Sequence, residues 1–81
     1  MDVLLYGSLS DRIGPRVTVA VPQAGCSVAE LRLLVASQHP SVGGDILQTR
    51  VRAFVDDAAV ADAARVDPAQ TVEFLPPVSG G

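Results

Sequence analysis

The stretch from residue 27 to residue 38 constrains the fold most, because it carries both a start signal and a stop signal for a helix. Ser27 can cap a helix that begins at Val28, and Glu30 follows Ser27 by three residues, which completes a capping box. The helix must end before Pro40, since a residue that precedes proline disfavours the helical region. We therefore expect one main helix between Val28 and Pro40.

This helix has one apolar face. The apolar residues that share it are Val28, Leu31, Leu34 and Val35. The residues expected largely outside it are Glu30, Arg32, Ser37 and Gln38. Such a pattern predicts a helix that packs one side on a core.

The residues before the helix predict two strands. The apolar run 3–6 is typical of a buried strand, and Gly7-Ser8 interrupts it. Residues 8–13 can form one helical turn, and Gly14-Pro15 forces a turn. Between residues 17 and 21, valines alternate with Thr and Ala in the period of a half-buried strand. We expect the two strands to form an antiparallel hairpin.

After the helix, residues 41–49 are interpreted as a loop with a short helical turn. Alternating side chains predict a strand over residues 51–55. Asp56-Asp57 is a turn candidate that leads into a weak strand over residues 58–60.

The last strand is expected over residues 71–75, after a turn at Asp67-Pro68. The side chains of this strand alternate, with Val72 and Phe74 on one face and Glu73 and Leu75 on the other.

This order of elements predicts an α+β fold, with a mixed sheet of four to five strands packed on one main helix. The long connection through the helix permits a parallel pairing between strands near the two ends of the chain. We expect one domain over residues 1–76, followed by an extended tail over residues 77–81.

Charge and cysteine content narrow the function classes. Nine acidic residues against six arginines give a formal charge of −3, which argues against nucleic acid as a partner. Cys26 is the only cysteine, so one chain can form neither a disulfide nor a four-cysteine metal site. Because no stretch resembles a signal peptide or a membrane span, we expect a cytoplasmic protein with no membrane partner.

Three other positions have ordinary structural interpretations. Cys26 is expected to be a passive thiol in the loop before the helix. His39 is interpreted as a solvated residue at the helix C-terminus, and Asp56-Asp57 as a turn. We therefore expect no catalytic site and no metal site at these residues.

The last eight residues, Phe74 to Gly81, join a strand end, a proline pair and a Gly-Gly ending. Glycine has no Cβ, so such an end can enter a narrow channel and present its α-carboxylate to a reaction. Pro76 and Pro77 restrict φ and favour an extended exit. The alternative is an ordinary frayed tail.

These residues together resemble the ubiquitin-like β-grasp sulfur carriers, and most closely the MoaD family, the small subunits of molybdopterin synthase. The resemblance covers nearly the whole chain and depends on the strand 3–6, Gly14, the helix start 27–31 and the ending 74–81. Its most specific part is Pro-Pro-Val-Ser-Gly-Gly, since the thiamine branch usually lacks the proline pair.

The chain differs from the family pattern at two places. The family often has an arginine where Ser10 stands, and a Gly-Asp pair where Ala69-Gln70 stands. The first difference concerns a partner contact and the second concerns the build of a turn, so neither affects the tail.

The resemblance implies a β-grasp fold and a non-catalytic role. An E1-like (MoeB-like) enzyme would use ATP to adenylate Gly81, and a sulfur donor would convert the adenylate to a thiocarboxylate. The carrier itself would bind no cofactor and no metal. The sulfur would pass to a cyclic pterin precursor in the large synthase subunit (MoaE-like), within a heterotetramer of two small and two large subunits.

The resemblance also implies the candidate site residues. Gly81 would carry the sulfur, and the residues that thread the tail would be Pro76, Pro77, Val78, Ser79 and Gly80. Leu75 and Phe54 are the candidate partner interface, with Val78 beside them. The alternative is that these apolar side chains complete the core.

Two other functions stay open. The chain could carry sulfur for another pathway, such as thiamine, cysteine or tRNA thiolation, through the same Gly81 chemistry. It could also be a ubiquitin-like protein modifier or an interaction module. A β-grasp ferredoxin is excluded by the single cysteine.

Overall fold

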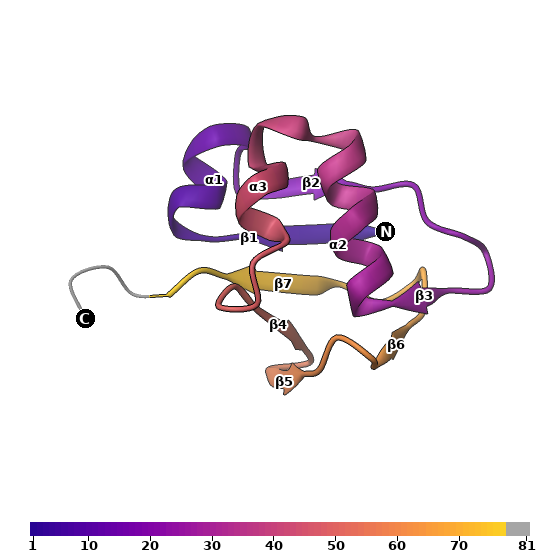
Figure 1. Ribbon diagram of the computed structural model, residues 1–81. Coiled ribbons are helices and arrows are strands. Elements are labelled where there is room, and N and C mark those ends of the chain that lie inside the picture. The colour runs from indigo at the N-terminus through magenta and orange to yellow at the C-terminus, as the bar shows by residue number, and fades with distance from the viewer. Residues whose placement is uncertain (78–81) are drawn as a thin grey trace.

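A computed structural model describes residues 1–77 of the chain (Figure 1). Five strands form the main sheet: β1 (Asp2–Leu5), β2 (Arg16–Thr18), β4 (Arg52–Val55), β5 (Ala58–Val60) and β7 (Val72–Leu75). The helical elements are α1 (Gly7–Ile13), α2 (Val28–Gln38), the 3-10 turn η1 (Pro40–Val42) and α3 (Gly43–Ile46). Two further short strands, β3 (Cys26–Ser27) and β6 (Arg65–Val66), pair with each other.

The main sheet is mixed and has the strand order β2-β1-β7-β4-β5. β1 and β2 are antiparallel, which confirms the predicted hairpin, although α1 lies between the two strands in the chain. β1 and β7 are parallel, with Leu5 opposite Phe74. The first and last strands therefore meet in the middle of the sheet, as the long connection through α2 allows.

Helices α1, α2 and α3 lie on one side of the main sheet (Figure 1). Each contributes buried side chains to one core, including Leu9 from α1, Leu31 from α2 and Ile46 from α3. From the sheet, alternate residues such as Leu5 and Phe74 point into the same core. The other face of the sheet carries no helix within residues 1–77.

Helix α2 begins and ends where its signals predict. Ser27 Oγ accepts a hydrogen bond from the Glu30 backbone N–H, and the Glu30 carboxylate accepts one from the Ser27 N–H. The bond from the Ser27 N–H to the carboxylate, followed by the contribution of the Ser27 hydroxyl, lowers the pKa of Glu30 below its usual value. The helix ends at Gln38, two residues before Pro40.

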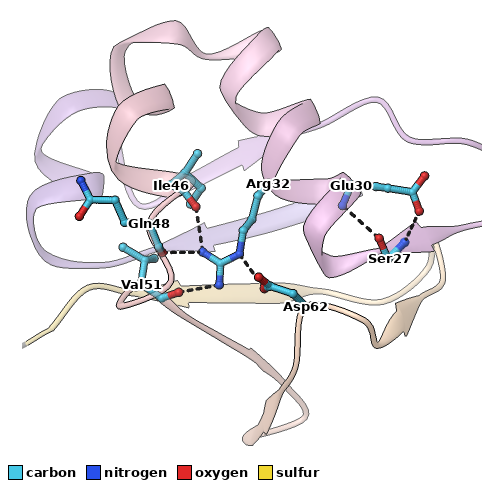
Figure 2. A network of polar contacts seen from close by, with 7 residues as sticks. All are labelled: Ser27, Glu30, Arg32, Ile46, Gln48, Val51 and Asp62. Carbon is cyan, nitrogen blue, oxygen red and sulfur yellow. Dashed lines mark hydrogen bonds and ion pairs between the residues drawn. The ribbon is translucent and has the colours of Figure 1, made fainter.

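The prediction that Arg32 lies outside the buried face of the helix is wrong, since this residue is only 5% exposed. Its guanidinium donates to the backbone carbonyls of Ile46, Gln48 and Val51 and to the carboxylate of Asp62 (Figure 2). It also lies 5.3 Å from the centroid of the Phe74 ring. A buried guanidinium is tolerated when its donors are satisfied, and here it holds the segment before β4 against α2.

The strand predicted over residues 17–21 is shorter than expected, because β2 ends at Thr18. The next backbone groups find other partners: the Val19 N–H donates to the Met1 carbonyl. The side-chain amide of Gln38 then bonds both the N–H and the carbonyl of Ala20. A side chain of α2 thus replaces a strand partner at Ala20.

Two interpretations of single residues need correction. Cys26 lies in β3 rather than in a loop and is buried. Burial raises the pKa of its thiol, with a smaller contribution from the Glu30 charge, which supports the reading as a passive thiol. His39 follows α2 but is only partly exposed, and its buried Nε2 has no hydrogen-bond partner within residues 1–77, so the prediction of a solvated residue is wrong.

Candidate functional site

The tail leaves the molecule from the middle of the sheet. β7 lies between β1 and β4 and ends at Leu75, and Pro76 and Pro77 continue directly from it (Figure 1). Pro76 is half-buried and Pro77 is exposed. The body of the domain therefore fixes the start of the tail, while the tail residues Val78, Ser79, Gly80 and Gly81 lie outside the described part of the chain.

Beside this exit, the helix-free face of the sheet forms a mixed polar and apolar surface, which we call the open face. The pairing registers place one row of side chains across it: Arg16, Leu4, Glu73, Phe54 and Ala59. A neighbouring pair, Leu75 and Arg52, lies closer to the exit. The open face thus reaches Leu75, the residue that directly precedes the two prolines of the exit.

Leu75 and Phe54 both belong to the open face. Leu75 lies on the strand face opposite the buried Phe74, which confirms that it points outward. Phe54 follows the buried Ala53 and is half-buried itself. Neither side chain is part of the core cluster, so the alternative that they complete the core is wrong for both. Their role in binding a partner stays a prediction.

Tyr6 is a candidate site residue that the sequence does not reveal, because the apolar run 3–6 predicts it inside the buried strand. β1 ends at Leu5, and Tyr6 is 41% exposed. Its hydroxyl donates a 2.5 Å hydrogen bond to Oε2 of Glu73, in the middle of the open face. That bond to a carboxylate, more than any other contribution, raises the pKa of Tyr6 above its usual value. In the sequence, the only signal for the exposure of Tyr6 is its position at the end of the apolar run 3–6.

A hollow of about 400 Å³ lies at the base of the tail. Ser8, Arg50, Pro76 and Pro77 are among the residues that line it. The Asp45 carboxylate at its edge is 2.7 Å from Arg12, so this charge is already paired. The hollow thus marks a concave surface beside the two prolines from which the tail continues.

The remaining candidate residues form no site of their own. Asp56 and Asp57 both have positive φ, at 51° and 65°, and connect β4 to β5 as a two-residue turn, which confirms their structural role. Within residues 1–77, no group of three His, Cys, Asp or Glu side chains is arranged to hold a metal ion. No helix of that part is long and apolar enough to cross a bilayer.

Comparisons with known proteins agree with this geometry. The model of the ThiS family matches residues 3–81 of the chain. The crystal structure of SAMP1 from Haloferax volcanii superposes with a TM-score of 0.82 at 23% identity, and the match covers 100% of this chain and 98% of that one. A search of curated proteins finds no significant match. The likeness to SAMP1 shows the fold, and it confirms the β-grasp prediction.

Proposed function

The chain belongs to the ThiS family of ubiquitin-like sulfur carriers, and within that family we propose that it is the sulfur-carrying small subunit of a molybdopterin synthase. Carriers of this family work with E1-like adenylating enzymes and are generally not catalysts themselves. In our proposal the carboxylate of Gly81 is the site that the activating enzyme modifies.

One observation carries the proposal. The family match extends through residue 81, so it includes the Gly-Gly pair as well as the β-grasp body. The described residues support the same division of labour, since the body ends in a central strand and a proline pair that lead toward these glycines. The body supplies docking surface and position, and the tail supplies the reacting group.

The chemistry explains why such a tail is needed. A carboxylate is a poor electrophile, so Gly81 first attacks the α-phosphorus of ATP, and pyrophosphate leaves. A sulfur nucleophile from the donor then attacks the acyl carbon of this adenylate, and AMP leaves. When this nucleophile is the outer sulfur of a donor persulfide, a thiol then reduces the S–S bond to the donor, and the sulfur remains on Gly81 as a thiocarboxylate, which is a stronger nucleophile than the parent carboxylate.

The choice of molybdopterin synthase depends on the proline pair in Pro-Pro-Val-Ser. In this proposal the large subunit encloses the tail, and the sulfur passes to a cyclic pterin precursor. Four residues, Val78 to Gly81, span at most about 13–14 Å when extended. The open face must therefore dock close to the mouth of the large subunit's active site. Enclosure would also keep water away from the acyl group.

Reconstitution tests the function and separates it from its nearest rival. The chain is loaded with sulfur by an E1-like enzyme and a sulfur donor, and is then mixed with a molybdopterin synthase large subunit and cyclic pterin precursor. Formation of the dithiolene product supports the proposal. A loaded chain that neither binds the large subunit nor forms the product would instead indicate a carrier for another pathway, such as thiamine or tRNA thiolation.

A further inference from the structure

We infer that Gly7 is a positioning residue for the tail, because the absence of a side chain at this residue lets Pro76 pack on the first residue of α1, where the chain turns out of β1. This inference rests on the proposed function, since it concerns how the reacting end is presented. Gly7 and Pro76 are 69 positions apart in sequence but lie in contact at the exit of the tail.

The contact leaves little room for a side chain. A Cβ placed on Gly7 would lie 3.0 Å from Cγ and 3.8 Å from Cδ of Pro76. The first distance is shorter than ordinary van der Waals contact, so the proline ring or the turn would have to move. Gly7 also has a φ of +56°, in the left-handed region that favours glycine.

The turn at Gly7 is held from both sides, so it resists displacement. On one side, Leu5 pairs with Phe74, and Tyr6 donates its hydroxyl to Glu73. On the other side, the Ser10 hydroxyl donates a 2.9 Å hydrogen bond to the Gly7 carbonyl. A side chain at position 7 would therefore displace Pro76 rather than the turn.

Displacement of Pro76 changes the direction in which the chain leaves the sheet. Pro76 follows the last residue of β7, and Pro77 follows it, so two restricted φ angles transmit the orientation of the exit. The reaction at Gly81 depends on a close approach of the reacting atoms, and a small misplacement can lower its rate severely. The open face that docks the carrier does not include Gly7, so binding should change little.

Gly14 provides a matched control. It has a φ of +94° and a ψ of 169°, a region that only glycine occupies readily, so a side chain there strains the backbone as well. Among the atoms of residues 1–77, a Cβ on Gly14 would meet nothing within 4 Å. The pairs Gly7→Ala with Gly14→Ala, and Gly7→Leu with Gly14→Leu, therefore separate an effect on the exit from a general loss of stability.

The experiment measures adenylation and thiocarboxylate formation by an E1-like enzyme, with the carrier as the varied substrate. Relative to the Gly14 variant, we expect Gly7→Leu to lower kcat by about ten- to a hundredfold and leave KM within about threefold. Gly7→Ala should have a smaller effect in the same direction. Pro76→Ala removes Cγ and Cδ, so Gly7→Ala should cost less kcat in that background than in the wild-type chain.

NMR of the carrier alone tests the contact without any enzyme. Nuclear Overhauser contacts are expected between the Gly7 α-protons and the Pro76 ring, and their absence would overturn the inference. If the wild-type chain gains no sulfur, the proposed function fails and the positioning role fails with it. If the wild-type chain is loaded but position 7 and position 14 variants react with equal kcat, only the inference is overturned.

Discussion

The Tyr6 hydroxyl donates its hydrogen bond to Glu73 across the parallel pair β1 and β7, and so ties the turn after the first strand to the strand that leads into the tail. The bond lies on the exposed side of the sheet, where a partner is expected to dock. Because the Tyr6 hydroxyl is titratable, the contact can be followed directly in solution.

We predict that Tyr6 ionises above the ordinary tyrosine pKa of about 10, because its proton is held by the Glu73 carboxylate. Ultraviolet titration reports this residue alone, since the chain has one tyrosine and no tryptophan. Glu73→Ala should move the transition down toward the ordinary value, and Asp57→Asn should move it less, because Asp57 makes the smallest contribution to the shift. A transition that Glu73→Ala leaves unchanged would rule out the bond in solution.

The sign of the associated stability follows from the raised pKa. The stabilisation is present at pH values below the ordinary tyrosine pKa and is lost as the pH rises through the higher value of the folded state. Tyr6→Phe should therefore unfold at a lower denaturant concentration than the wild-type chain at neutral pH. This difference in denaturant midpoint should vanish at strongly alkaline pH.

Arg32 gives the largest predicted effect on stability. Arg32→Ala removes the donors to three backbone carbonyls and to Asp62, and leaves a cavity beside Phe74. We expect the free energy of unfolding to fall by roughly 2–4 kcal/mol, measured by urea denaturation. Leu33→Ala, at the neighbouring residue that is 60% exposed, is the control and should cost less than about 0.5 kcal/mol. Equal losses would show that the Arg32 network stabilises nothing.

The open face should control docking rather than folding. We expect Phe54→Ala and Leu75→Ala each to weaken binding to the activating enzyme by about five- to thirtyfold, as loss of a central apolar anchor does. Isothermal titration calorimetry measures the affinity, and circular dichroism checks the fold. Leu33→Ala is again the matched control, because Leu33 belongs to α2, on the other side of the sheet. Unchanged affinity for both open-face variants would place the interface elsewhere.

The elements that the sequence predicts well are those with local signals. The capping box sets the start of α2, and Asp56-Asp57 marks the turn between β4 and β5. Alternation in β7 places Phe74 inward and Leu75 outward. In each case, neighbouring residues alone determine the conformation, so a single sequence suffices.

The elements that the sequence misses depend on distant partners. β3 and β6 have two residues each, and Cys26 meets Val66 only after the chain has folded. Arg32 has the same helical spacing as Val28, Leu31 and Val35, yet its charge suggested an exposed position. Its burial requires carbonyls from residues 46–51, which no local pattern reveals.

The candidate site divides in the same way. The tail and Leu75 can be predicted from the sequence. The roles of Tyr6 and Gly7 cannot, because they depend on contacts with Glu73 and Pro76, respectively. Both contacts span most of the chain, because β1 and β7 are neighbours in the sheet. Topology, rather than composition, brings the two ends of the domain together at the exit of the tail.

Intact mass spectrometry of the chain, after co-expression with an E1-like activating enzyme and a sulfur donor, tests the central claim most directly. We predict a species in which one oxygen of the Gly81 carboxylate is replaced by sulfur. A variant that lacks Gly81 should show no such species, although its circular dichroism spectrum should match that of the wild-type chain. A wild-type chain that stays unmodified, or a Gly81 deletion that is loaded equally well, would contradict the proposal that Gly81 carries the sulfur.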